Sequence, residues 1–134
     1  MSGNVPRLLL PDTVFMRSIA DVRAACAALP GSCETFPFDA TTLVFKVGGK
    51  MYALTDITGD PVTLSLKVRP EWGDDLRAGY PAIVPGYHLN KRHWVTVTLD
   101  GTVPEALLHD LLTGSHTLVL SSLTRAQRAE LGLV

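Results

Sequence analysis

The sequence predicts an α+β fold, in which helices pack on one face of an antiparallel sheet. Two observations lead to this prediction. Apolar and polar residues alternate, as they do in half-buried strands, through most of residues 41–69 and again over residues 94–99. Apolar residues at helical spacing come before this region and after it. A run of strands enclosed by helices is typical of α+β domains, so we expect the sheet face opposite the helices to be partly open.

Three helices are expected from their start signals and their apolar spacing. The first covers about residues 18–28 and begins at Ser18, an N-cap residue with Asp21 three positions later as an acidic variant of the capping box. The other two begin at Pro70 and Pro104, because proline is favoured at the first helical position. The short helix after Pro70 has acidic residues early and an arginine late, which suits the helix dipole.

The strands are predicted from alternation and from the turn residues that separate them. Gly48 and Gly49 lie between two alternating runs and fit a two-residue hairpin turn, which needs positive φ angles. Residues 62–69 and 94–99 are predicted as further half-exposed strands. Residues 34–38 are predicted as a short edge strand, because the proline within them cannot donate to a ladder.

Length and composition indicate one globular domain. The chain has 134 residues, of which 46% are hydrophobic and 19% are charged, which is typical of a folded chain and not of a disordered one. Residues 1–16 lack a clear period and are predicted to be an N-terminal extension of a single domain over residues 17–134. No segment is apolar enough for a membrane span or a signal peptide, so we expect a cytoplasmic protein without membrane contact. We also expect a monomer.

The densest group of candidate functional side chains lies in the 85–94 loop and on the open face next to it. Residues 80–92 are predicted to be a loop that leads directly into the strand beginning at Trp94. Alternation along the strands places basic residues on the same face as this tryptophan. The candidate site residues are Lys46, Lys67, Arg69, His88, Asn90, Lys91, Arg92, His93 and Trp94.

Basic side chains beside an aromatic ring suit a nucleic-acid backbone with a base stacked on the ring. On this hypothesis the lysines and Arg92 contact phosphates, Trp94 stacks on a base and Asn90 contacts a base edge. The net charge of −1 argues against binding by bulk charge alone. Two other interpretations stay open: the open face can be an ordinary solvated surface, and His88 and Asn90 can bond backbone groups that hold the loop in place.

No catalytic or metal site is expected. The two histidines of the loop bracket Lys91 and Arg92, whose positive charges disfavour a metal ion. Cys26 and Cys33 are seven residues apart and match neither a zinc nor a redox pattern, so we expect two reduced thiols. No nucleophile motif or phosphate-binding glycine loop occurs. We therefore expect no cofactor and no catalysis, and a loop histidine acting as acid or base is kept only as a third hypothesis.

Four segments resemble the MmcQ/YjbR family. They read LPGSCETFPF, TTLVFKVGGKMYAL, VTLSLKV and YPAIVPGYHLNKRHWVTVTLDGTVP, and the similarity extends over about residues 18–123. The resemblance implies a CyaY-like fold, with helices on one face of an antiparallel sheet, and a protein of a type commonly labelled DNA-binding. Analogy with frataxin-like proteins also raises iron handling, but the first helix carries only Asp21 where that role would need an acidic ridge.

The resulting hypothesis is a small binding protein that contacts DNA through the open sheet face and the 85–94 loop, without catalysis. The alternative is a module that binds a small anionic ligand or another protein with the same loop. In both cases the basic side chains of the loop face the partner.

Overall fold

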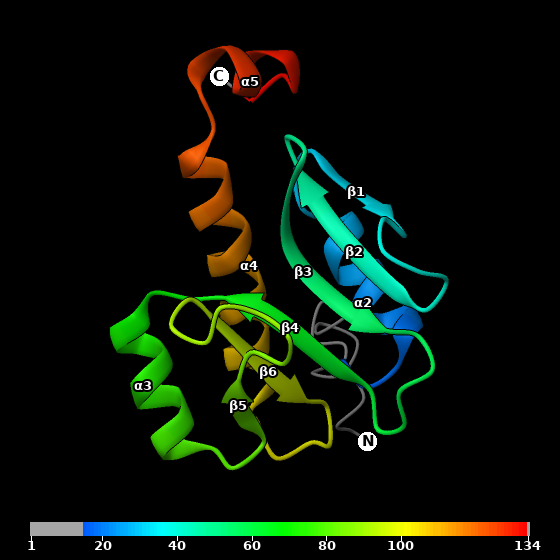
Figure 1. Cartoon of the computed structure of the whole chain (residues 1–134), viewed down its shortest axis with the longest axis vertical. Coiled ribbons are helices and arrows are strands. Elements are labelled where there is room, and N and C mark those ends of the chain that lie inside the picture. Colours follow the sequence, from blue (N-terminus) through cyan, green and yellow to red (C-terminus); the bar gives the residue numbers. More distant parts are fainter. Residues whose placement is uncertain (1–14, 134) are drawn as a thin grey trace, which may run out of the picture.

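A computed structural model describes residues 15–133 as a six-stranded sheet with four helices. The helices are α2 (Ile19–Ala27), α3 (Pro70–Gly79), α4 (Glu105–Ser122) and α5 (Arg125–Glu130) (Figure 1). The strands are β1 (Ser32–Thr35), β2 (Thr42–Val47), β3 (Lys50–Asp56), β4 (Thr63–Lys67), β5 (Ile83–Pro85) and β6 (Trp94–Thr98). They pair antiparallel throughout, in the order β1-β2-β3-β4-β6-β5. The predicted N-terminal extension lies outside the described residues except for its last two.

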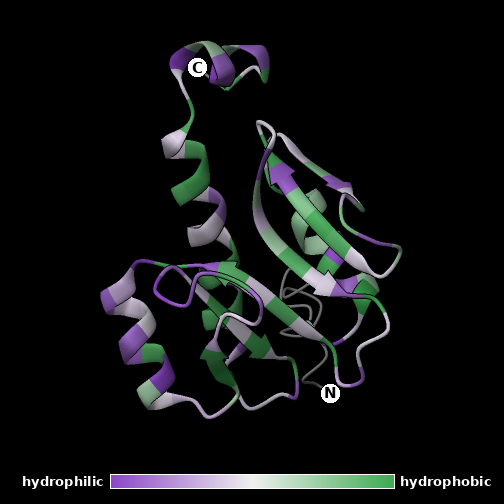
Figure 2. Ribbon diagram, viewed as in Figure 1, coloured by the Kyte–Doolittle hydropathy of each residue, from purple (hydrophilic) through white to green (hydrophobic). Residues whose placement is uncertain are grey.

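The helices that cover the sheet share one face of it, which confirms the predicted α+β architecture. Val22 of α2, Leu111 of α4 and Leu64 of β4 belong to one buried apolar cluster. In Figure 1, α2 lies behind β2 and β3. Figure 2 shows the central strands as largely hydrophobic, whereas α5 and the loop before β6 are mostly hydrophilic. No helix within residues 15–133 combines the length and apolar character needed to cross a membrane.

The start signals of the first two predicted helices and the predicted hairpin turn are confirmed, whereas the last helix begins at Glu105, because Pro104 is its N-cap. Ser18 Oγ accepts the N–H of Asp21 at 3.0 Å, and the Asp21 carboxylate accepts the N–H of Ser18 at 3.0 Å, which completes the capping box. Gly48 and Gly49 have φ angles of 59° and 79°, as a two-residue hairpin turn requires. Pro70 is the first residue of α3.

Two strand predictions differ from the structure. The edge strand β1 covers residues 32–35 and not 34–38, because Pro37, which follows the strand, has no N–H with which to extend the ladder. The predicted loop over residues 80–92 contains the three-residue strand β5, whose Ile83 pairs with Val97. A strand of three residues is too short to show a period, so alternation could not reveal it.

The sheet splits between β3 and β4, and α4 bridges the split. These strands pair only at Ala53 with Leu66 and at Leu54 with Ser65. At the next position Ser115 of α4 reaches between them. Its Oγ accepts the N–H of Lys67 at 2.9 Å and donates to the Tyr52 carbonyl at 2.5 Å. The long helix is thereby anchored to the sheet at the residue that carries the Lys67 side chain.

Candidate functional site

The face of the sheet opposite the helices is built from alternate rungs of the ladder between β4 and β6. These rungs are Thr63 with Thr98, Ser65 with Thr96, and Lys67 with Trp94. They share one face because side chains alternate along a strand, and Leu64 and Leu66 between them point into the core. The open face therefore changes along β4 from hydroxyl-bearing to basic.

The basic end of this face, which we call the cationic end, carries five predicted site residues. They are Lys46, Lys67, Arg69, Lys91 and Arg92. The ladder places Lys46 opposite Met51 and Lys67 opposite Trp94, at the same end of the sheet. Arg69 follows β4 directly, and the other two cations lie in the loop that leads into β6. The two ion pairs within residues 15–133 involve none of these five side chains.

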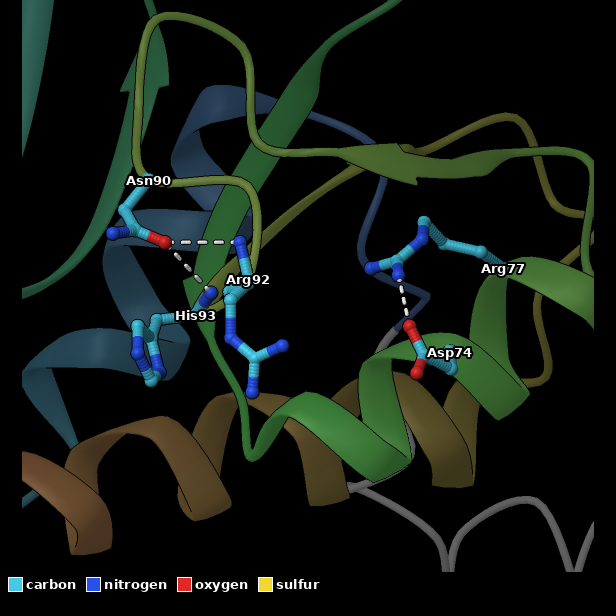
Figure 3. Close-up of polar contacts among 5 residues, drawn as sticks. All are labelled: Asp74, Arg77, Asn90, Arg92 and His93. Atoms are coloured by element: carbon cyan, nitrogen blue, oxygen red, sulfur yellow. Dashed lines mark hydrogen bonds and ion pairs between the residues drawn. The ribbon is translucent and has the colours of Figure 1, made fainter.

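The loop between β5 and β6 is held in place by its own side chains. Asn90 Oδ1 accepts the backbone N–H groups of Arg92 at 2.9 Å and His93 at 3.3 Å, so the amide is directed back at the chain that follows it (Figure 3). Lys91 Nζ donates to the Gly86 carbonyl at 3.1 Å. These contacts confirm the structural role that the sequence left open for Asn90. The side chains of Arg92 and His93 are exposed.

The expectation that the indole of Trp94 is exposed for stacking is wrong. Trp94 is only 7% exposed. The loop returns onto it: Gly86 N–H donates to the Trp94 carbonyl at 2.8 Å, and Trp94 N–H donates to the Asn90 carbonyl at 3.0 Å. Sequence alternation places Trp94 on the correct face but carries no information about a loop folding over that face.

A groove of about 900 Å³ opens on the remainder of the open face, and we call it the polar groove. Its floor carries the hydroxyl-bearing residues Thr42, Thr63, Ser65, Thr96 and Thr98. One wall contains Phe38 and Asp39 from the loop between β1 and β2, and the other contains Tyr87, His88 and Leu89 from the loop before β6. Phe38 and Tyr87 are 66% and 69% exposed, so each wall offers an accessible aromatic ring.

The floor of the polar groove holds one hydroxyl proton without an acceptor. Ser65 Oγ and Thr96 Oγ1 lie 2.8 Å apart, and Thr96 Oγ1 also accepts the N–H of Tyr87 at 3.0 Å. Two hydroxyls carry two protons, and only one proton can serve the bond between the two oxygens. The other has no acceptor in the described part of the chain, although Ser65 and Thr96 are only 6% and 7% exposed. A ligand that brings an acceptor to the floor would complete the pair.

Two carboxylates line the polar groove, and no lysine or arginine within residues 15–133 does. Backbone N–H groups of Thr42 at 2.6 Å and Thr41 at 2.9 Å lower the pKa of Asp39. The hydroxyl of Thr58 at 2.6 Å and its N–H at 2.8 Å lower the pKa of Asp56 in the same way. Both groups are ionised at neutral pH, so this end of the groove is negatively charged.

The polar groove adjoins the cationic end. Met51 lines the groove and is the ladder partner of Lys46. The rung of Ser65 and Thr96 is followed by Lys67 two residues along β4, a distance of about 6.6 Å along a strand. A ligand with one anionic part and one neutral, hydrogen-bonding part would meet both regions.

Sequence reasoning missed the aromatic walls of the groove. Phe38 and Tyr87 lie in loops, where no period marks the exposed side. Tyr87 does fall within the PGYHLNKRHW segment, and this is the signal that could have found it. His88 next to it also lines the groove, has a φ of 58°, and its ring centroid lies 4.0 Å from that of Tyr87.

The described residues contain no cluster suited to metal binding and no disulfide. No three histidine, cysteine or acidic side chains within residues 15–133 lie close enough together to hold a metal ion. Both cysteines are free, as expected, with Cys26 buried and Cys33 exposed. Burial raises the pKa of the Cys26 thiol to about 12, which keeps it protonated and unreactive at neutral pH.

The chain is similar to solved structures and to curated proteins that are described as uncharacterized. The crystal structure of Deinococcus radiodurans protein DR2400, a DUF419 domain, has 59% sequence identity and a TM-score of 0.86, and the match covers 91% of this chain and 93% of that one. A Pseudomonas syringae protein has 33% identity and a TM-score of 0.57 over 66% of this chain and 86% of that one.

The curated relatives point to one family. Uncharacterized protein YbdF of Escherichia coli O157:H7 is 40% identical over 91 residues, or 67% of this chain and 74% of that protein. Uncharacterized protein YjbR of Escherichia coli (strain K12) is 30% identical over 111 residues, or 83% of this chain and 94% of that protein. The family model described as YjbR matches residues 27–118. This match spans the whole sheet and most of α4, and the chain therefore belongs to the YjbR family.

Proposed function

We propose that the chain binds DNA through its cationic end and does not catalyse a reaction. The observation that carries this proposal is that five cations, from one end of the strands and from the adjoining loop, make no ion pair within residues 15–133. A group of unpaired positive charges is suited to phosphate oxygens, which supply most of the affinity between proteins and DNA. The net charge of −1 means that this attraction is local.

Some of these cations extend from strands and others from the loop before β6. Lys46 and Lys67 extend from strands and are half-buried, so their position is set by the sheet. Lys91 and Arg92 extend from the loop whose backbone Asn90 holds in place. Rigidly placed phosphate contacts position DNA without reading its sequence. Trp94 has no part in the contact, because the loop covers it.

The test is duplex binding measured by fluorescence anisotropy at several salt concentrations. Three or four phosphate contacts predict a log–log salt slope of about −3. Lys67→Gln and Arg92→Gln should each weaken binding and reduce the slope by about 1. Arg125→Gln is the matched control, since it removes the same charge from exposed α5, beyond the end of α4 (Figure 1). The proposal would be contradicted by an affinity that does not change with salt concentration. It would also be contradicted if all three variants lowered the affinity equally.

A second candidate is a small anionic ligand held by the same cations. It is favoured by the polar groove beside them, because 900 Å³ lies within the usual size of small-ligand pockets. Thermal stabilisation by a nucleotide or a carboxylate at micromolar concentration, with no binding to DNA, would favour this candidate over the first.

A further inference from the structure

We propose that the polar groove takes the base of one unpaired nucleotide while the cationic end holds the neighbouring phosphates. This inference rests on the proposed function and specifies the form of DNA that is bound. It is carried by the walls of the groove, by its floor and by the distribution of charge along the open face.

Each wall offers a surface on which a flat, neutral ring can stack. Tyr87 and Phe38 are 69% and 66% exposed, although each lines the groove. They stand on opposite sides, because Phe38 precedes β2 and Tyr87 follows β5, and the sheet order places β3, β4 and β6 between them. Exposed aromatic rings beside a positively charged surface are the usual stacking partners of unpaired bases.

The floor suits the edge of a base. The buried pair of Ser65 and Thr96 has one spare O–H donor, and every base carries acceptor atoms on its edge. The carboxylate of Asp56 uses Oδ1 for the backbone and hydroxyl of Thr58. Its Oδ2 makes no hydrogen bond within residues 15–133, and a carboxylate oxygen accepts from an amino group, which adenine, cytosine and guanine carry.

The charge distribution limits the site to a single base. Asp39 and Asp56 line the groove, and Asp60 and Asp100 lie just beyond the same ends of β4 and β6. A phosphate backbone that ran past the groove would meet these carboxylates and be repelled. The strand must therefore stay at the cationic end and send one base into the groove. A base in an intact duplex is stacked and paired, so an unpaired base enters at much lower cost.

The experiment compares two duplexes that differ only in the presence of one base. One carries a single unpaired adenine, and the other carries an abasic residue at the same position, so that both have the same number of phosphates. We expect the adenine duplex to bind about tenfold tighter, since stacking of one base on an aromatic side chain supports a change of this size. Tyr87→Ala should abolish this difference, whereas Tyr87→Phe should retain it. Lys67→Gln should weaken binding of both duplexes by the same factor.

The outcomes separate this inference from the proposed function. Equal binding of the two duplexes, with the expected salt slope, would overturn the inference and leave DNA binding standing. The absence of binding to either duplex would overturn both. Tyr87→Ala should fold normally, because the ring is exposed and the contact to Thr96 comes from the Tyr87 backbone. A thermal unfolding curve superimposed on that of the unmodified protein checks this.

Discussion

Tyr52 and Lys67 face each other across the gap between β3 and β4 and are joined through a third residue. The ladder pairs Ala53 with Leu66, so Tyr52 and Lys67 would form the next rung. In place of a direct bond, Ser115 Oγ accepts from Lys67 N–H and donates to the Tyr52 carbonyl. The side chain of a helix thus completes the backbone bonding of the sheet beneath the cationic end.

Ser115→Ala should lower the free energy of unfolding by about 2 kcal/mol or more. The change leaves a backbone N–H and a carbonyl without their partner, and each such buried group costs about 1–3 kcal/mol. Ser115 is 0% exposed, so water cannot take its place without rearrangement. Urea denaturation measures the change. Ser121→Ala, at an exposed position of α4, is the control and should alter stability by no more than about 0.5 kcal/mol.

Gly86→Ala should destabilise the loop that covers Trp94. A Cβ at position 86 would lie 2.6 Å from Trp94 Cβ and 3.0 Å from the Trp94 carbonyl oxygen, neither of which can move aside easily. We expect a loss of about 1–3 kcal/mol, as for other overpacked sites. In a Trp72→Phe background, the remaining indole should emit at longer wavelength as the loop lifts. Gly79→Ala has no atom within 4 Å of its new methyl group and should be neutral or stabilising. Unchanged fluorescence and stability in Gly86→Ala would disprove the packing described for this loop.

Substitutions at Asn90 should separate loop structure from partner binding. Asn90→Ala removes the acceptor for two backbone N–H groups and should cost about 1 kcal/mol, in line with other local side-chain caps. Asn90→Asp keeps the acceptor and should preserve stability. It also places a negative charge among the cations, so it should weaken DNA binding more than Asn90→Ala does. Equal binding by the two variants would argue against electrostatic contact at this loop.

Ionisation of the Cys26 thiol should lower the free energy of unfolding at alkaline pH. Burial raises the pKa of this thiol from 9.0 to about 12, so the folded state keeps a proton that the unfolded state has lost. The resulting stabilisation is complete below pH 9 and is lost as the pH rises from 9 toward 12. Urea midpoints measured at about pH 7 and about pH 10 should therefore differ less in Cys26→Ala than in the unmodified protein. Cys33→Ala, which removes the exposed thiol, is the matched control for the loss of a cysteine. An identical alkaline decline in Cys26→Ala would show that other groups cause it.

Local patterns were sufficient for much of the fold. The capping box of Ser18 and Asp21 and the turn at Gly48 and Gly49 depend on neighbours within a few residues, so the chain itself contains the whole signal. Alternation likewise assigned Lys67 and Trp94 to the same face, because adjacent side chains must point to opposite sides of a strand. The short strand β5 was missed, since three residues do not establish a period.

Some features of the candidate site were likewise predictable from the sequence, and others were not. Periodicity and composition alone predict the α+β architecture, the shared face of Lys67 and Trp94, and the basic character of the loop. The burial of Trp94, the bonds from Asn90 to the loop backbone and the groove between Phe38 and Tyr87 are seen in the folded chain and not in any sequence pattern. The path of a loop depends on contacts between residues that are far apart in the chain. Such contacts leave no periodic pattern in the sequence.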